Sequence, residues 1–414
     1  MKMLLQLSVL IIIFIITLSS CSIVNSLRMM NANNEIKPSW KTAQRNKQIL
    51  TAHYIGEKPY IKLTVNKQHE LLFLVDTGAS FTMLFDTPAV SKLQFKKGYS
   101  LAVAGWGEGE NTPAYQTQLS ELEINDISFE KVDVAYIPVS TSQYYLTEDE
   151  AIFDGVIGHD LMRHFVWTFD KKNQTISLSV EASPRQANDV VLPFKTSLSK
   201  ISIPSTVYFN DKDSITRNIV IDTGSRHYMK MNTAFTDKNK IKLPASSIRA
   251  ADFGLSGKAP HQRMTLPALQ LGYLTLRSVK TNIIKSDDED DWWILGSALL
   301  NQFVTIIDYP NRQFTIRPYP DVKFKTRYNL AGLDLRKLRG GNLIVRYVYP
   351  KLPGQIAAIQ AGDVVSSINN KRSDTITEED WLLMASEPSD FTLCFTTDIC
   401  KSFQTEEIEG YSVR

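Results

Sequence analysis

The sequence has few of the residues that carry metal or nucleophilic chemistry. Only 6 of its 414 residues are histidine. The pair His159 and His164 superficially has the spacing of a zinc helix, but no glutamate follows His159 and no third ligand is evident. No Ser/His/Asp arrangement and no phosphate-cradling loop stands out either. We therefore expect no metal and no cofactor, and we expect both histidines to lie on the surface or to pack in the interior.

An excess of charge of one sign is also missing. The formal net charge is +2, and 22% of the residues are charged. No basic run with interleaved aromatic residues appears, so the composition indicates neither a polyanionic partner nor nucleic acid binding. A length of 414 residues is enough for about two to four domains with buried cores.

The sequence does contain an apolar run that ends in Asp-Thr-Gly, and this run occurs twice. Residues 72–80 read LFLVDTGAS and residues 219–225 read IVIDTGS. Each run is rich in apolar and β-branched residues, and it predicts a buried strand that stops at a glycine-permitted turn and presents Asp76 or Asp222 at its tip. A single copy would indicate only a strand that ends in a turn, since Asp and Gly are common turn residues.

A second shared pattern follows each copy. The first copy is followed by Val156-Ile157-Gly158 and the second by Ile294-Leu295-Gly296. Aligning the two glycines also aligns Leu161 with Leu299, Phe165-Val166 with Phe303-Val304, Asp170 with Asp308 and Asn173 with Asn311. A repeat of about 140 residues is too long for a solenoid unit and about right for a lobe. The chain is therefore predicted to be a tandem of two related halves.

These elements resemble the aspartic proteases, in which each of two lobes carries Asp-Thr-Gly beside a hydrophobic-hydrophobic-Gly strand. The resemblance covers residues 50–318, and the short lobes look like two retropepsin-like lobes fused in one chain. It implies an all-β fold with two pepsin/retropepsin-like lobes in tandem. It also implies Asp76 and Asp222 as the catalytic pair, with support in the two loops from Thr77, Gly78, Thr223, Gly224 and Ser225.

The chemistry of such a pair follows from the proximity of its charges. Two carboxylates about 3 Å apart cannot both ionise, so they share one proton and hold an acid and a base together, as is general for aspartic proteases. The base takes a proton from water while the acid polarises the peptide carbonyl. Ala79 stands where pepsin-like enzymes have Ser or Thr, whereas the second lobe keeps Ser225. A hydroxyl that is missing beside the charged carboxylate predicts a raised pKa of the pair and activity towards neutral pH.

Two glycine-rich segments are candidates for flaps over the substrate. Residues 101–111 occupy the expected place in the first lobe, with Trp106 or Tyr115 as the flap aromatic, and residues 253–258 are the counterpart in the second lobe. A plain surface hairpin is the alternative. Acidic runs at residues 148–150 and 287–291 precede the hydrophobic-hydrophobic-Gly strands. They predict either solvated loops or an electrostatic preference for basic substrate residues.

The N-terminus has the pattern of a targeting segment. Lys2 precedes an apolar run from Leu7 to Leu18, and residues 18–21 read LSSC, which resembles a bacterial lipobox. An ordinary signal peptide or an anchor helix is the alternative, although the run barely spans a bilayer. We assign residues 1–21 to a signal peptide with a lipidated Cys21 and residues 22–50 to a flexible tether. This predicts a lipid-anchored protein of a bacterial cell envelope, at its periplasmic or outer-membrane face.

A third unit follows the two lobes, which we place at residues 51–183 and 188–320. Residues 322–408 resemble a PDZ domain, most specifically in the sequence AGDVV at residues 361–365. By that resemblance Gly332, Leu333, Asp334 and Leu335 form the loop that binds a peptide C-terminus. Asp334 departs from the pattern, because an acidic side chain would repel a carboxylate. The sequence leaves open whether Cys394 and Cys400 form a disulfide or stay reduced.

Together these features predict an aspartic endopeptidase that acts on polypeptides, with a PDZ domain that recruits a peptide C-terminus or regulates access. The rival is a catalytically silent protease-like lipoprotein whose real activity is peptide binding. Both Asp-Thr-Gly motifs are intact, which favours the enzyme. A glycosidase with paired carboxylates is a third reading, but it gives no reason for the Asp-Thr-Gly repeat.

Overall fold

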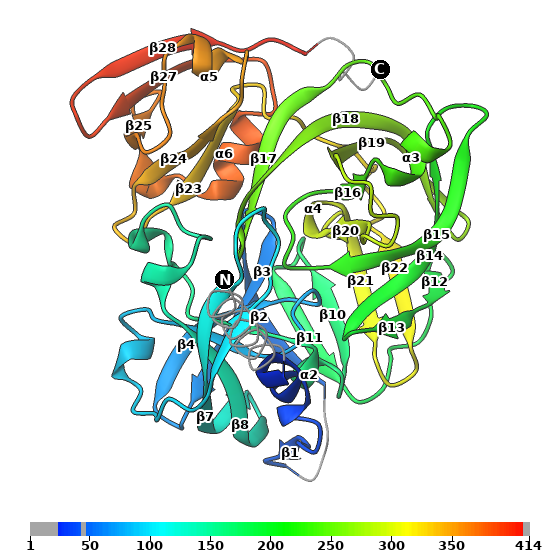
Figure 1. The fold of residues 1–414 in the computed structure, drawn as a ribbon, viewed down its shortest axis with the longest axis vertical. Coiled ribbons are helices and arrows are strands. Elements are labelled where there is room, and N and C mark those ends of the chain that lie inside the picture. Colours follow the sequence, from blue (N-terminus) through cyan, green and yellow to red (C-terminus); the bar gives the residue numbers. More distant parts are fainter. Residues whose placement is uncertain (1–23, 43–46, 409–414) are drawn as a thin grey trace, which may run out of the picture.

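The computed structural model describes residues 24–42 and 47–408, and the fold is mostly β (Figure 1). Residues 1–23, which include Cys21 and the apolar run, lie outside the described residues. In the part of the chain that the structure describes, no helix is both long and apolar enough to cross a membrane.

The two lobes share one strand order. The first lobe runs β2-β3-β4-β9-β5-β8-β7-β6 and the second runs β13-β14-β15-β20-β16-β19-β18-β17. The additional pairings, β3 with β7 and β14 with β18, are also equivalent. The first-lobe strands are β2 (Gln48–Ile55), β3 (Lys58–Val65), β4 (His69–Val75), β5 (Met83–Phe85), β6 (Ser100–Val103), β7 (Thr112–Ile124), β8 (Ile127–Ile137) and β9 (Gly155–Ile157).

The second lobe repeats this arrangement with its own loops. Its strands are β13 (Lys195–Ser197), β14 (Lys200–Tyr208), β15 (Ser214–Asp222), β16 (Met229–Asn232), β17 (Ile248–Gly254), β18 (Gly257–Leu271), β19 (Leu274–Ile284) and β20 (Ile294–Gly296). Short helices follow the paired glycine strands: α2 (His159–Met162) in the first lobe and α4 (Ser297–Leu300) in the second. The second lobe also contains α3 (Ala234–Lys238).

A shared sheet joins the lobes into one body. β10 (Val166–Asp170) pairs antiparallel with β21 (Phe303–Asp308), so that one strand from each lobe meets at the centre. The sheet continues through β11 (Thr175–Ser179) on one side and through β22 (Gln313–Pro318) and β12 (Val190–Pro193) on the other. The turns after β10 and β21 are built alike, because Asp170 binds Asn173 and Asp308 binds Asn311 through two hydrogen bonds each. These are the positions that the sequence repeat aligns.

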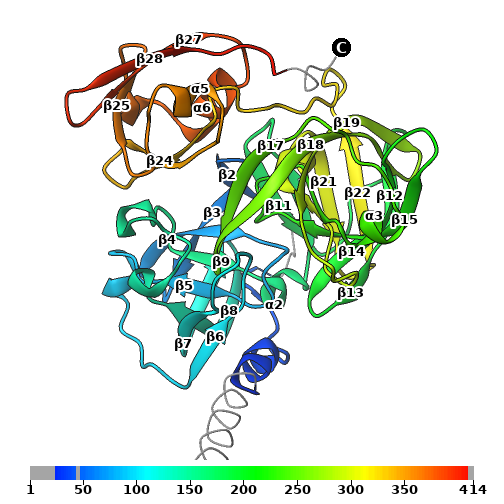
Figure 2. The same cartoon turned by 45° about the horizontal axis from the view of Figure 1, so that its top comes forward.

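The N-terminal segment packs on the first lobe instead of forming a free tether. Residues 24–32 are helical and lie along β6, where Asn25 Nδ2 donates to the Ser100 carbonyl (2.8 Å) (Figure 2). Met29 is 1% exposed, and Asn33 Nδ2 donates to Asp160 (2.7 Å). β1 (Ser39–Trp40) then pairs with β8. The prediction of a flexible tether over residues 22–50 is therefore wrong for residues 24–40, because buried apolar and amide groups fix this segment.

The C-terminal domain has its own sheet and core. The sheet contains β23 (Leu333–Lys337), β24 (Leu343–Val348), β25 (Val364–Ile368), β26 (Lys371–Arg372), β27 (Asp390–Phe395) and β28 (Cys400–Gln404). Two helices accompany it, α5 (Pro353–Ile356) and α6 (Glu378–Met384). Thr377 and Asp380 begin α6 with a capping box, and Trp381 fills the core. Cys394 and Cys400 form a disulfide across the β27–β28 hairpin.

Candidate active site

Each candidate catalytic aspartate sits at the end of a buried strand that is paired in parallel with a glycine strand. β4 ends at Val75, and the Asp76 N–H donates to the Ile157 carbonyl of the neighbouring strand β9 (3.1 Å). In the second lobe Asp222 ends β15 directly opposite Gly296 of β20. These are the hydrophobic-hydrophobic-Gly segments of the sequence repeat. They hold both aspartates at the same edge of their sheets.

The two loops are locked to each other by reciprocal hydrogen bonds. Thr77 Oγ1 donates to the Ile221 carbonyl (2.7 Å), and Thr223 Oγ1 donates to the Val75 carbonyl (2.7 Å). Each hydroxyl also accepts the backbone N–H of the other threonine at 3.1 Å. Both threonines are fully or almost fully buried. The resemblance implied that these two threonines support the loops, and their four hydrogen bonds hold one loop against the other.

The glycines of the two motifs bring the carboxylates together. A Cβ on Gly78 would lie 2.7 Å from the Asp222 carboxylate, and one on Gly224 would overlap the Asp76 carboxylate. Within each loop the glycine N–H donates to its own aspartate, from Gly78 to Asp76 Oδ1 (2.6 Å) and from Gly224 to Asp222 Oδ1 (2.9 Å). Both aspartates line one cavity of about 610 Å³. Two carboxylates from two lobes therefore face a single space that can hold a substrate.

Comparison with known protein families agrees with this geometry. Residues 61–161 match the aspartyl protease family model. The matched segment runs from β3 to α2 and contains Asp76-Thr77-Gly78 and Val156-Ile157-Gly158. A comparison with curated proteins finds no match. The second lobe lies outside the matched segment, so the equivalence of Asp222 rests on the shared strand order and the reciprocal loop contacts.

Burial and mutual repulsion keep a proton on the pair. Burial first, and the neighbouring charge of Asp222 second, raise the pKa of Asp76 to about 7. The ammonium of Lys200, the Gly78 N–H and the ammonium of Lys58 oppose this rise. Among the described residues, no hydrogen bond joins the Ser225 hydroxyl to Asp222. The difference between Ala79 and Ser225 is therefore not the cause of the raised pKa of Asp76, which comes from burial and from the charge of Asp222.

Two lysines at equivalent positions flank the pair, and sequence reasoning missed both. Lys58 begins β3 and Lys200 begins β14, and both line the cavity. The strand registers pair Tyr60 with Leu74 and Ser202 with Val220, and Leu74 and Val220 each lie two residues before the aspartate of their lobe. Each lysine lies two residues before Tyr60 or Ser202 on its strand, so the two lysines are equivalent. Lys200 Nζ donates to the Gly78 carbonyl, and Lys58 Nζ donates to the Tyr144 hydroxyl (3.0 Å). The lysines lie at different distances from their aspartates in the sequence, so motif spacing does not reveal them.

The two glycine-rich tips meet over the cavity. The Ser256 N–H donates to the Trp106 carbonyl (3.0 Å), and Thr112 Oγ1 donates to the Leu255 carbonyl (2.6 Å). Trp106 and Leu255 line the cavity, and the Lys230 ammonium lies over the Trp106 ring. Tyr115 is not among the lining residues, because it sits within β7 opposite Ser100. Of the two predicted flap aromatics, only Trp106 therefore reaches the site.

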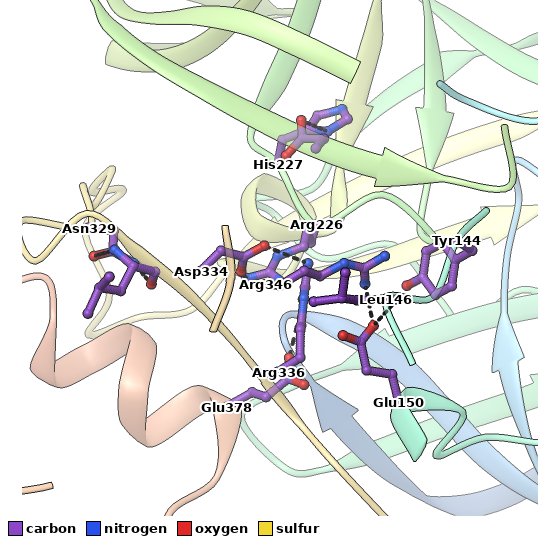
Figure 3. A network of polar contacts seen from close by, with 12 residues as sticks. Tyr144, Leu146, Glu150, Arg226, His227, Asn329, Asp334, Arg336, Arg346 and Glu378 are labelled. Carbon is purple, nitrogen blue, oxygen red and sulfur yellow. Dashed lines mark hydrogen bonds and ion pairs between the residues drawn. The ribbon is translucent and has the colours of Figure 1, made fainter. Parts of the chain in front are cut away.

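The acidic runs do not line the cavity. Glu150 pairs with Arg346 (3.3 Å; Figure 3). Asp149 pairs with Arg339 (3.1 Å), so the first run holds the C-terminal domain. In the second run Glu289 pairs with Lys238. Trp292, which follows this run, lines the cavity, whereas residues 287–291 do not. Only three carboxylates of the two runs, Asp149, Glu150 and Glu289, form ion pairs among the described residues. The attraction of basic substrate residues stays a prediction, and the charged groups that flank the catalytic pair inside the cavity are lysines.

The proposed peptide-binding loop of the C-terminal domain is occupied by its own chain. Asn329 Oδ1 accepts the N–H groups of Gly332 (2.9 Å) and Leu333 (3.4 Å), which are the donors that a peptide carboxylate would need. Asp334 pairs with Arg226 (3.3 Å) and Arg336 (3.4 Å) (Figure 3). Leu335 is buried in the core. The donors of this loop are therefore engaged within the chain, and Asp334 faces the second catalytic loop.

The predicted packing histidines lie against aromatic rings. His159 contacts Tyr309 at 5.4 Å between ring centroids, and His164 contacts Phe129 at 5.8 Å. Burial lowers the pKa of each to about 4. Among residues 24–42 and 47–408, no group of three or more His, Cys, Asp or Glu side chains is placed to hold a metal ion.

Proposed function

We propose that the protein is an aspartic endopeptidase in which Asp76 and Asp222 activate one water between them. The observation that carries this proposal is the reciprocal packing of the two Asp-Thr-Gly loops, in which a Cβ on either glycine would collide with the carboxylate of the other lobe. One carboxylate takes a proton from the water as its oxygen attacks the peptide carbonyl carbon. The other donates its proton to the carbonyl oxygen. Proton transfer to the amide nitrogen then releases the amine as the C–N bond breaks.

The architecture around the pair supports a polypeptide substrate. The cavity of about 610 Å³ lies beneath two tips, which can cover an extended chain and exclude water. Lys58 and Lys200 line the cavity with the catalytic pair, and neither forms an ion pair among the described residues. The substrate that fits this charge carries Glu or Asp near the scissile bond.

We expect cleavage sites to be enriched in Glu or Asp within a few residues of the cut. A charge-assisted hydrogen bond contributes about 1.5 to 3 kcal/mol, so Lys58→Gln or Lys200→Gln should reduce the preference for an acidic peptide over its Gln analogue about tenfold or more. Profiling a peptide library with parent and variants measures this, with Lys242→Gln as an exposed control. Equal acidic enrichment in the parent and both cavity variants would rule out the lysines as specificity residues.

The pH dependence should have its alkaline limb near neutrality. The pair must keep one proton, and the pKa of Asp76 is raised to about 7, so activity is present below that pH and lost as pH rises through it. Lys200→Met removes a charge that lowers this pKa, and it should move the limb to higher pH. Initial rates from pH 3 to 9 measure the shift, with Lys212→Met in an exposed turn as control. A limb that stays in place in Lys200→Met would show that this ammonium does not act on the pair.

Digestion of an unfolded protein mixture from about pH 3 to pH 8 tests the proposed activity itself. We expect internal cuts, with new termini found by mass spectrometry, and no requirement for added metal. Cuts that persist unchanged in Asp76→Asn and Asp222→Asn would assign the activity to a contaminant or to another site.

We further propose that Cys21 anchors the protein by a lipid in a bacterial envelope and that the C-terminal domain is PDZ-like. The anchor rests on the lipobox-like sequence LSSC. The domain proposal rests on the AGDVV turn before β25 and on α6 beside β23. Because Asn329 caps the carboxylate-binding loop, the domain is proposed to regulate the second lobe through Asp334 and Arg226 rather than to recruit peptides through that loop.

A further inference from the structure

A second cavity lies between the second lobe and the C-terminal domain. It has a volume of about 240 Å³ and sits behind the catalytic loop of the second lobe, where Arg226, His227 and Tyr228 form one wall. The C-terminal domain supplies the opposite wall through Asp334 of β23 and Leu383 of α6. Leu383 is 47% exposed, so the cavity reaches solvent along this helix.

The charges around this cavity do not balance. It is lined by five cationic side chains and four carboxylates: Lys171, Arg226, Arg263, Lys280 and Arg327 against Glu57, Asp252, Asp334 and Glu379. Three of the carboxylates have cationic partners. Glu57 pairs with Lys171 (2.5 Å), Asp252 with Arg263 (3.7 Å) and Asp334 with Arg226 (3.3 Å).

Two basic side chains remain after this pairing. Lys280 and Arg327 have no ion pair among the described residues, and burial lowers the pKa of Lys280 well below its usual value, so an anion beside Lys280 would favour its charged form. The Lys280 ammonium contacts the Arg327 carbonyl and lies near the faces of Tyr228 (4.7 Å) and Tyr328 (5.4 Å). The remaining carboxylate, Glu379, is engaged by the Glu57 N–H (3.1 Å) on the side of the first lobe. The cavity therefore offers positive charge to a ligand.

Two buried polar atoms on the wall lack hydrogen-bond partners. They are Arg226 Nη1 and His227 Nε2, and neither has a partner among the described residues. Both residues lie between this cavity and the catalytic cavity and line each of them. His227 is only 7% exposed, so solvent does not replace the missing partner. A buried polar atom without a partner is costly, which makes such a pair on a cavity wall evidence for an absent ligand. An oxyanion accepts hydrogen bonds from both groups and neutralises the surplus charge.

We propose that this cavity binds a compact oxyanion, a carboxylate or a phosphate, between Arg226, Lys280 and Arg327. The anion is either free in solution or the terminal carboxylate of a peptide lying along α6. Arg226 directly follows Ser225 of the catalytic loop and joins the C-terminal domain through Asp334 (Figure 3). Occupancy therefore fixes the C-terminal domain against the second catalytic loop. This binding does not depend on the proposed peptidase activity.

Calorimetric titration of the full-length protein with inorganic phosphate tests the first source. Saturable binding is expected, and Arg327→Gln and Lys280→Gln should each weaken it at least about tenfold, since each removes one charge-assisted contact. Arg327 is exposed at the cavity rim, so its replacement leaves the fold intact. Lys242→Gln, an exposed lysine away from the cavity, serves as control.

A peptide arm distinguishes the second source. A short peptide with a free C-terminus is titrated into the Asp76→Asn variant, so that it stays uncut, and its C-terminal amide is the comparison. Binding of the free acid alone, displaced by phosphate, identifies a terminal carboxylate. Binding of phosphate without either peptide identifies a free anion. The proposal is overturned if neither probe binds at millimolar concentration, or if binding is equally strong in Arg327→Gln and Lys280→Gln.

Discussion

Asp76→Asn and Asp222→Asn are each expected to lower kcat/KM by about 10³-fold or more. Neither variant can both accept a proton from water and donate one to the carbonyl oxygen, and general acid–base catalysis contributes about 10² to 10⁴ in rate. Asparagine keeps an oxygen for the Gly78 or Gly224 N–H, so the loop geometry survives. A fluorogenic peptide derived from an identified cut site gives the rates.

The control for this pair is an aspartate outside the site. Asp211 lies exposed in the β14–β15 turn, and Asp211→Asn should leave the rate unchanged. Thermal unfolding of all variants separates lost chemistry from lost folding. If either active-site variant retained activity within about tenfold of the parent while folded, that aspartate would have no role in acid–base catalysis.

Arg226→Ala is expected to cost about 3 kcal/mol in the free energy of unfolding and to loosen the C-terminal domain. It removes the partner of Asp334, whose side chain is 6% exposed, and breaking a buried ion pair costs about 3 to 5 kcal/mol. Arg336 stays 3.4 Å from Asp334, which places the effect at the low end of that range. Urea unfolding followed by tryptophan fluorescence measures the change.

A double-mutant cycle isolates the contact between these domains. Asp334→Asn and Arg226→Ala together should be less destabilising than the sum of the two, by about 1 kcal/mol or more, because the residues share one contact. Arg372→Ala provides the matched control, since its pair with Asp374 is exposed and such pairs contribute about 0 to 1 kcal/mol. Additive effects would mean that Arg226 and Asp334 do not interact across the interface.

The catalytic strands could be predicted because their signal is local and occurs twice. An apolar run, a turn and a glycine are adjacent in sequence, and the repeat supplies the pairing of Asp76 with Asp222. The all-β fold follows from the same runs. The family match to residues 61–161 agrees with the first lobe.

The remaining features depend on contacts that no local pattern encodes. Lys58 and Lys200 become equivalent only through strand register. Arg226 and Asp334 are far apart in sequence, so composition around either one indicates nothing about their ion pair. Asn329 turns back onto its own loop, which removes donors that the resemblance assigned to a ligand. Residues 24–40 have the polar composition of a linker, yet Met29 and Asn33 bury enough contact to dock them.

The central claim is that Asp76 and Asp222 act as one pair that shares a proton. The most direct test is an NMR titration of protein labelled with ¹³C at the aspartate carboxyl carbon, comparing the parent with Asp222→Asn. We predict that the Asp76 carboxyl of the parent keeps its proton until about pH 7 and loses it at lower pH in Asp222→Asn, where the neighbouring charge is gone. Identical Asp76 titrations in the two proteins would contradict the account, because the carboxylates would then not interact.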